Sequence, residues 1–256
     1  MNNYNKTVLA IQAHPDDTEI FCSGTLALLK DKGFKIVIAT MTPGGMGGVT
    51  HNEKGTSEIR KKEAAKAAEV LEAEYYCLEQ RDGYVFDNTE ARIKVTSLIQ
   101  KVKAGIVFTH LPYDYHSDHR ATSTIVEAGT MLATLPNVPT NEEPVTLTPL
   151  LYYTSPFGFT NNMGDKIPDP SFFIDVTTTF EKKKEMLSYH DSQKKVMELM
   201  FNIKDFFGDM RDFDHKLGKM SGVKYAEAYW QNTGGGFNNF PFIQEVLKEF
   251  KREKEI

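Results

Sequence analysis

The run Val8-Leu9-Ala10-Ile11 is followed closely by Ala13-His14-Pro15-Asp16-Asp17-Thr18-Glu19. A short apolar run bounded by turn-forming residues predicts a buried strand. The histidine and the adjacent carboxylates therefore stand where the strand ends and its loop opens. In open α/β sheets, ligands bind outside the carboxyl ends of the strands.

A second polar cluster has the same placement. His116-Ser117-Asp118-His119 follows another short apolar run, Ile106-Val107-Phe108. Two sets of metal-capable side chains are thus expected at the ends of two strands. Together they predict a hydrolytic metal site.

The spacing within the clusters suits one divalent metal, Zn²⁺, which favours imidazole and carboxylate ligands and keeps a position open for water in catalytic sites. His14 and Asp17 are three residues apart, so both converge on one ion if Pro15 and Asp16 begin a helical turn. His119 supplies the third ligand. Asp16 points differently from Asp17 and stays uncoordinated, as a candidate general base.

Each cluster alone has a simpler interpretation. His-Pro-Asp-Asp could be a turn in which Asp17 or Thr18 caps the following helix. A His-x-x-His pair also recurs by chance on surface loops. The occurrence of both clusters, each after a predicted strand, favours the metal site.

The first half of the chain alternates between apolar runs and helical patterns. Strands are expected at 8–11, 36–39, 75–78 and 106–108, and helices at 18–32, 57–73, 91–103 and 121–135. This alternation predicts an α/β fold: a Rossmann-like, doubly wound, mostly parallel sheet with helices on both faces. In that strand order the first and fourth strands are neighbours, which brings the two clusters to one crevice.

The second half is less regular. Loops are expected at 136–149 and 156–170, strands at 150–154 and 172–176, and helices at 179–202 and 244–254. A length of 256 residues suits one sizeable core. We expect a single domain over 1–256, with a core at about 5–135 and residues 150–256 completing the fold and the substrate crevice.

The two motifs resemble the signatures of the PIG-L/LmbE-like zinc deacetylases, which remove acetyl groups from N-acetylglucosamine-type sugars. The resemblance extends to Thr40 to Gly45 after the second strand, to Arg60 with Glu63, to His190 with Ser192-Gln193, and to Ala226-Glu227-Ala228-Tyr229.

The resemblance implies a role for each matching position. The implied zinc ligands are His14, Asp17 and His119, the general base is Asp16, and the group that stabilises or protonates the tetrahedral intermediate is His116, oriented by Asp118. Arg60 and His190 are expected to contact the substrate. His110 and Asp114, by contrast, are expected to support the loop that follows the fourth predicted strand.

The net charge of −5 comes from a mixture of both signs, without the basic stripe typical of nucleic-acid binders. Lys182-Lys183-Lys184 is interpreted as a solvated helix face. Cys22 and Cys77 are expected to be free thiols in a reducing compartment. With no secretory signal or bilayer-spanning stretch in view, we expect a cytoplasmic protein and leave a homo-oligomer open.

The sequence therefore predicts an enzyme, a zinc-dependent amide hydrolase that releases acetate and a free amine from an N-acetylated sugar or glycoconjugate. One alternative is a metal-dependent amidase or phosphoesterase acting on another small substrate, although a phosphoesterase usually needs a second metal. Another is a non-catalytic sugar-binding protein, since a fold does not prove an activity.

Overall fold

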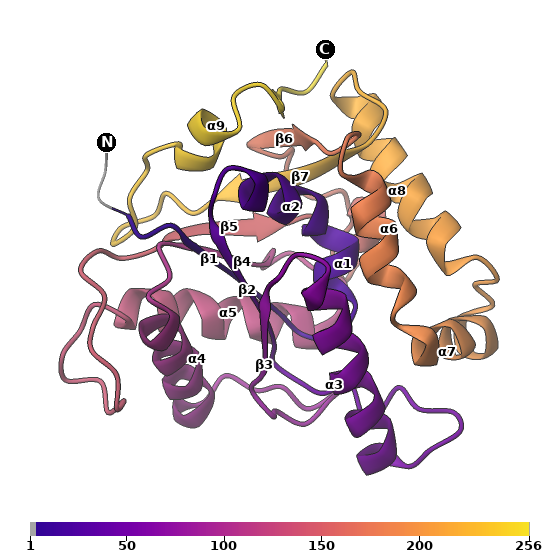
Figure 1. Cartoon of the computed structure of the whole chain (residues 1–256), viewed down its shortest axis with the longest axis horizontal. Helices are drawn as coiled ribbons and strands as arrows, with labels where there is room; N and C mark the ends of the chain where they lie inside the picture. Colours follow the sequence, from indigo (N-terminus) through magenta and orange to yellow (C-terminus); the bar gives the residue numbers. More distant parts are fainter. Residues whose placement is uncertain (1–3, 256) are drawn as a thin grey trace.

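The computed structural model describes residues 4–255, and within them one eight-stranded sheet forms the centre of the molecule (Figure 1). The strand order is β3-β2-β1-β4-β5-β7-β6-β8. The strands are β1 (Thr7–Gln12), β2 (Lys35–Thr40), β3 (Glu74–Cys77), β4 (Ile106–His110), β5 (Leu150–Thr154), β6 (Phe172–Asp175), β7 (Ala226–Gln231) and β8 (Lys251–Arg252).

The five strands from β3 to β5 are parallel, and the first and fourth strands are neighbours as expected. Val8 of β1 pairs with Ile106 of β4, and Ala10 with Phe108. The carboxyl ends of these two strands therefore lie at one edge of the sheet. The last three strands join antiparallel, and two of them, β7 and β8, were not predicted.

Helices cover both faces of the sheet, which confirms the predicted fold class (Figure 1). Alternate side chains of β1 face opposite ways: Leu9 belongs to the core cluster that includes side chains of α4, α5 and α8, whereas Val8 belongs to the one that includes side chains of α2, α3 and α9. The helices are α1 (Asp17–Phe21), α2 (Ser23–Asp31), α3 (Glu53–Glu69), α4 (Thr89–Val102), α5 (Ser117–Leu132), the 3₁₀ turn η1 (Phe157–Phe159), α6 (Phe180–Ser188), α7 (Asp191–Phe201), α8 (Phe206–Met220) and α9 (Phe242–Val246).

Three predicted helices differ from the structure. The helix expected at 18–32 breaks at Cys22, whose φ of −150° is not helical. The helix expected at 179–202 breaks at His190. The helix expected at 244–254 ends at Val246, and Lys251 and Arg252 pair with β6 instead. The helix α8 was not predicted.

Each break gives tertiary contacts that a continuous helix would not allow. At the first, the new N-terminus of α2 presents the amides of Gly24 and Thr25 to Glu227 of β7, at 2.9 and 2.8 Å. At the second, the first turn of α7 presents the amide of Ser192 to Glu63 of α3, at 2.9 Å. Carboxylates at helix N-termini stabilise the unpaired amides there.

Lys183 corrects the interpretation of residues 182–184 as a solvated face. Its side chain is fully buried, and its ammonium lies 2.9 Å from Asp214 of α8 and 2.8 Å from Glu227. Glu227 also accepts a hydrogen bond from Tyr229, at 2.8 Å. We call Lys183, Asp214 and Glu227 the lysine cluster.

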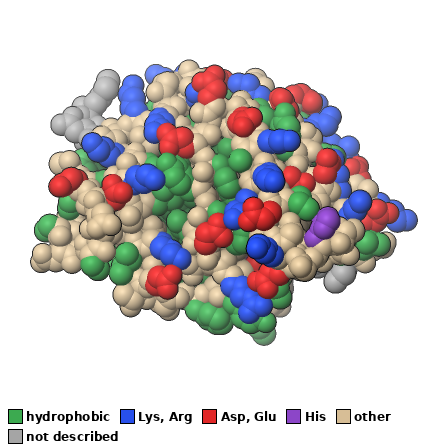
Figure 2. All heavy atoms as spheres, turned by 60° about the horizontal axis from the view of Figure 1, so that its bottom comes forward, with side chains coloured by type: hydrophobic (Ala, Val, Ile, Leu, Met, Phe, Trp, Pro, Cys, Tyr) green, Lys and Arg blue, Asp and Glu red, His purple; other side chains and the backbone are tan. Residues whose placement is uncertain are grey.

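The face shown in Figure 2 carries Lys and Arg interspersed with Asp and Glu, without a continuous basic stripe. This distribution agrees with the mixed-sign surface expected from the sequence. Over residues 4–255, the helices are all too short or too polar to cross a bilayer.

Candidate active site

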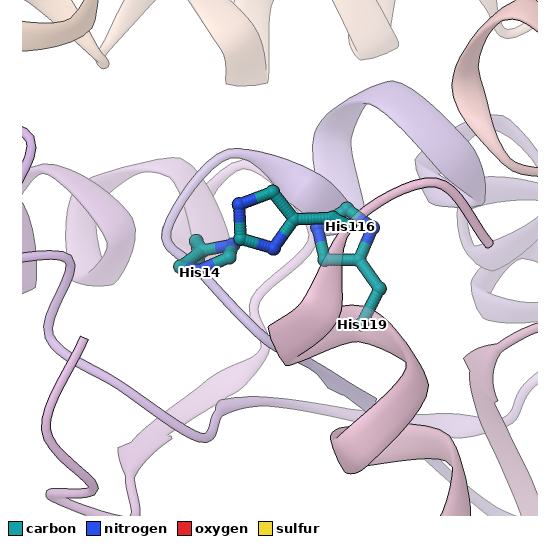
Figure 3. A group of neighbouring side chains, drawn as sticks. All are labelled: His14, His116 and His119. Carbon is teal, nitrogen blue, oxygen red and sulfur yellow. The ribbon is translucent and has the colours of Figure 1, made fainter. Parts of the chain in front are cut away.

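The loops that follow β1 and β4 meet at the carboxyl edge of the sheet, as their neighbouring positions require. The backbone amide of Ala13 donates to Nε2 of His110, at 2.9 Å, and this bond ties the two loops together. Figure 3 shows the imidazole rings of His14, His116 and His119 next to one another, two of them carried by the start of α5. The two motifs therefore form a single cluster.

Asp17 lies at the centre of this cluster. Its Oδ2 atom is 3.3 Å from Nδ1 of His14, 3.4 Å from Nε2 of His119 and 3.3 Å from Nε2 of His110. Burial alone would raise the pKa of the Asp17 carboxyl, but the positive charge of His119 and the contacts with His110 hold that pKa well below its usual value. Three imidazoles thus converge on one ionised oxygen.

A second ring of carboxylates contacts the other nitrogens of the two predicted histidine ligands. Nδ1 of His119 is 3.0 Å from Asp114, although the pair is not aligned as a hydrogen bond. Nε2 of His14 is 3.3 Å from Asp82 and 3.4 Å from Asp118. Metal-binding histidines commonly use one nitrogen for the ion and the other for a carboxylate.

These contacts leave Nδ1 of His14 and Nε2 of His119 facing Asp17. Two imidazole nitrogens and one carboxylate oxygen are a set of donors that Zn²⁺ favours. The excess of carboxylates around the rings also favours a cation: despite burial, the charge of Asp17 raises the pKa of His119 to about 9. The donors present fit a divalent metal. Three groups of side chains here lie close enough together to hold a metal ion. One is His14, His116 and His119; the second is Asp17, His110 and His119; the third is His14, Asp82 and Asp118.

The position of Asp118 differs from the predicted one. Its carboxylate accepts from the amide of Gly83 at 2.8 Å and contacts His14, whereas only its backbone amide meets His116, donating to Nδ1 at 3.2 Å. The reason is that Asp118 lies in the first turn of α5, where His116 is the N-cap and receives the backbone amide instead. Because Nδ1 of His116 is an acceptor, the proton of the neutral ring is on Nε2.

Asp16 stands beside Asp17 but faces another way. It adopts a left-handed backbone with φ of 99°, a conformation that Asp tolerates better than most residues. Burial raises the pKa of its carboxyl to about 6, and the charge of Asp17 adds to this, while Arg60 opposes it. Its Oδ2 atom is 3.4 Å from Arg60.

Arg60 braces the loops around Asp16. Its guanidinium donates to the carbonyl of Pro15 at 2.6 Å and to that of Gly44 at 2.9 Å. Gly44 has φ of +69°, and a Cβ there would lie 2.3 Å from the guanidinium. With its amide oxygen turned toward Arg60, Gln193 accepts from all three guanidinium nitrogens, at 2.7 to 3.1 Å.

The two residues predicted to contact the substrate differ in their surroundings. Arg60 lines the cavity next to the histidines, although only 4% of it is exposed. His190 is fully buried and is not among the residues that line this cavity; its Nε2 is 3.4 Å from Glu19. Their roles toward a substrate stay predictions.

Asp82 was missed by the sequence interpretation. It lies in the loop after β3, lines the cavity, contacts His14, and accepts from the amide of Met46 at 2.9 Å. Its position after a parallel strand, at the same edge as the two motifs, is the signal that could have identified it. His110 contacts Asp17 at 3.3 Å and Asp114 contacts His119 at 3.0 Å; the supporting roles expected of them stay predictions.

The cavity at this cluster has a volume of about 560 Å³. His14, Asp16, Asp17, His116 and His119 all line it. Its size falls within the range of small-molecule sites.

Comparison with known proteins relates these features to a family. The family profile described as PIG-L, GlcNAc-PI de-N-acetylase, matches residues 9–129, which include both motifs. The diacetylchitobiose deacetylase of Thermococcus kodakarensis is 31% identical over 87% of this chain and 81% of its own length.

Two solved structures superpose well. The N,N'-diacetylchitobiose deacetylase of Pyrococcus horikoshii, in complex with an inhibitor, has a TM-score of 0.74 and 26% identity, covering 93% of this chain and 87% of that one. The 4-carboxy-2-hydroxymuconate hydratase GalB of Pseudomonas putida has a TM-score of 0.70 at 20% identity, covering 91% and 99%. The second likeness shows the fold alone.

Proposed function

This chain belongs to the PIG-L family of de-N-acetylases, and from that membership we propose that it is a metal-dependent hydrolase that removes the acetyl group from an N-acetylglucosamine-type sugar or conjugate. The observation that carries the proposal is the convergence of His14 and His119 on Asp17, with Asp16 left uncoordinated beside them in the same cavity. A sugar-binding protein would have no need of such a carboxylate.

His14, Asp17 and His119 would hold the metal, which we propose to be Zn²⁺. When bound, a divalent cation of this kind acts as a Lewis acid and makes water easier to deprotonate near neutral pH. The outer nitrogens of the two imidazoles lie against carboxylates, that of His119 against Asp114 and that of His14 against Asp82 and Asp118, so that the inner nitrogens face the ion.

Asp16 is the proposed general base. Its carboxylate takes a proton from the attacking water, and the contact with Arg60 holds it at the cavity wall. His116 is the proposed partner of the developing oxyanion, because Nε2 carries the donor proton while Nδ1 is fixed by the Asp118 amide. The proton that Asp16 has taken from the water then passes to the departing amine, so that the protons balance and the His116 ring stays neutral.

Asp16→Asn tests the base. The amide is nearly isosteric but cannot take the proton, so this variant should keep its metal and lose most deacetylation, by roughly 10²-fold or more. Metal content and the joint release of acetate and primary amine are measured over a panel of N-acetylated sugars. Asp212→Asn, exposed on α8, is the matched control.

His116→Ala should likewise retain metal and lose turnover by about 10²-fold. Two results would contradict the proposal: a metal-loaded wild type that releases neither product from any sugar, or one that releases phosphate from a sugar phosphate instead. Loss of metal in His116→Ala would show that this residue is a ligand.

A further inference from the structure

One wall of the cavity is apolar. It is formed by Phe21 of α1, Phe157 of η1, Val196 of α7, and Phe206 and Met210 of α8, while Gln193 of α7 and Asp209 of α8 also line the cavity. Of the five apolar residues, all but the half-buried Phe157 are largely shielded from solvent. The helices α7 and α8, drawn in orange in Figure 1, stand at the side of the molecule away from α4.

This apolar wall begins at the reactive cluster. The ring of Phe21 meets His119 edge-on, with 6.1 Å between centroids, and meets His110 in the same way at 5.8 Å. Phe21 also contacts Phe213 at 6.4 Å, and Phe213 stacks on Phe157 at 5.1 Å. A chain of aromatic contacts thus runs from the imidazoles into α8.

Other parts of the cavity lining are polar. Asp82 and Gly83, from the loop after β3, lie near His14, and Arg60 lies near Asp16. A sugar carries a hydroxyl group on most of its carbons. Placing those groups against the apolar wall would leave them without hydrogen bonds, which costs about 1 to 3 kcal/mol for each buried group. The C–H face of a sugar ring can stack on an aromatic side chain, but its hydroxyls need polar partners, and Asp82 and Arg60 offer them on the polar side. We therefore place the sugar there.

The scissile amide joins the sugar nitrogen to an acyl carbon. If the sugar lies on the polar side, the acyl group points to the other side, toward Phe21. An acetyl group would bring only one methyl to a surface that extends through five side chains.

We propose that the apolar wall seats a linear acyl chain longer than acetyl, so that the enzyme hydrolyses N-acyl amino sugars with chains of four to six carbons. The inference rests on the proposed function. The C–N bond of the amide breaks, a C–O bond to water forms, and the products are a fatty carboxylate and a free amino sugar, with no redox change.

The helix α7, which carries Val196 of the wall, is anchored at its first turn. At the start of α7, the amide and hydroxyl of Ser192 donate to Glu63 of α3, at 2.9 and 2.5 Å, and Gln193 is held by Arg60. A preformed apolar seat loses little ordering entropy when a chain binds.

The first experiment varies chain length on the metal-loaded wild type. The kcat/KM for release of primary amine is compared among N-acetyl-, N-butyryl- and N-hexanoylglucosamine. Burial of each methylene favours binding by about 0.8 kcal/mol, so the hexanoyl substrate should exceed the acetyl one by roughly tenfold or more, with butyryl between them. The hexyl glycoside of N-acetylglucosamine should show no such gain.

A fall in kcat/KM with acyl length would overturn the inference, as would a gain for the hexyl glycoside alone, which would assign the wall to an aglycone. Turnover of acetyl but not hexanoyl substrates refutes this inference and leaves the deacetylase function standing. Failure of every N-acyl sugar refutes both.

The second experiment alters two half-buried apolar residues that line the cavity beside the wall, where folding is least at risk. Ile203→Asn and Met197→Asn both change residues that line the cavity. Each should lower the ratio of hexanoyl to acetyl kcat/KM by about fivefold. Leu199→Asn is the matched control, because Leu199 is 69% exposed on the same α7 and should leave the ratio unchanged. An unchanged ratio in both cavity variants would contradict the assignment.

Calorimetric binding of the two product carboxylates gives a readout that needs no variant. Hexanoate should bind the metal-loaded wild type about tenfold more tightly than acetate. Equal affinity would overturn the proposal.

Discussion

Lys183 and Asp17 each lie at the centre of a buried group of charged side chains. In the lysine cluster, the carboxylates of Asp214 and Glu227 meet an ammonium at 2.8 to 2.9 Å, and Glu227 also accepts from two backbone amides and a tyrosine hydroxyl. Around Asp17, three imidazole nitrogens lie at 3.3 to 3.4 Å, and Asp114 contacts the other nitrogen of one of these rings, His119, at 3.0 Å without the alignment of a hydrogen bond.

The two clusters differ in whether the protein itself supplies the cation that neutralises the carboxylates. The protein neutralises the lysine cluster with its own cation, held on a helix that packs against both carboxylates. Around Asp17 the protein supplies several carboxylates and imidazoles that can be neutral. Among the described residues, no lysine or arginine forms an ion pair with Asp17. A cluster of the second kind is suited to a cation from outside.

The largest effect is expected for His119→Ala. Removing one of three proposed ligands should empty the site and lower turnover by roughly 10³-fold or more, because two protein ligands hold zinc poorly. Elemental analysis and acetate release are the measurements. Full metal occupancy in the variant would show that His119 is not a required ligand, and the contrast with the lysine cluster would then fail.

Glu227→Gln probes the cluster that the protein completes itself. It leaves Lys183 with one carboxylate fewer, and breaking a buried ion pair costs about 3 kcal/mol or more of folding free energy, over a hundredfold in the equilibrium. Urea unfolding should show a lower midpoint, while folded protein keeps its metal. A midpoint equal to that of the wild type would contradict a structural role for this carboxylate.

Asp118→Asn distinguishes the observed partner of Asp118 from the predicted one. Because the carboxylate contacts His14, the substitution should weaken metal affinity by about 10- to 100-fold, as for other residues that orient ligands. Competition with a chelator measures this. Unchanged affinity with a shifted pH profile of turnover would support the original pairing with His116.

The smallest effect concerns pH. Burial raises the pKa of Asp214 to about 7 and the charge of Glu227 adds to this, while Lys183 opposes it. Between about pH 4 and 7 the folded state therefore holds a proton that the unfolded chain has released, and the stability from this group is lost as pH rises through that window.

Asp214→Asn cannot titrate, so the unfolding free energy of the wild type should fall relative to that of the variant by about 1 kcal/mol per pH unit between pH 5 and 7. Urea unfolding at several pH values compares the two slopes. Parallel slopes would show that Asp214 stays ionised beside Lys183 throughout.

Sequence patterns predicted the part of the fold that local and topological rules determine. The apolar runs of β1 and β4 identified two buried strands, and the doubly wound order placed His14 near His119. Asp16 and Asp17 were predicted to diverge, and their contacts differ as expected.

Side-chain partners could not be predicted in the same way, because they depend on elements distant in the sequence. Lys183 follows the pattern of an exposed charge until α8 and β7 pack over it. Asp118 is two residues from His116 at the start of α5, yet its carboxylate turns toward His14. The strand β7 contains a glutamate and a glutamine, and its antiparallel pairing is set by β5 and β6.

The bond from Gly24 to Glu227 joins residues 203 positions apart. During synthesis at about 5 to 20 residues per second, roughly 10 to 40 s separate the appearance of the amide from that of its acceptor. During this interval the backbone amides at the N-terminus of α2 lack the Glu227 carboxylate that accepts from them in the folded protein. These amides lie next to the loop that bears the first motif. We expect late consolidation of this corner, so a nascent chain halted before β7 should be a good chaperone client.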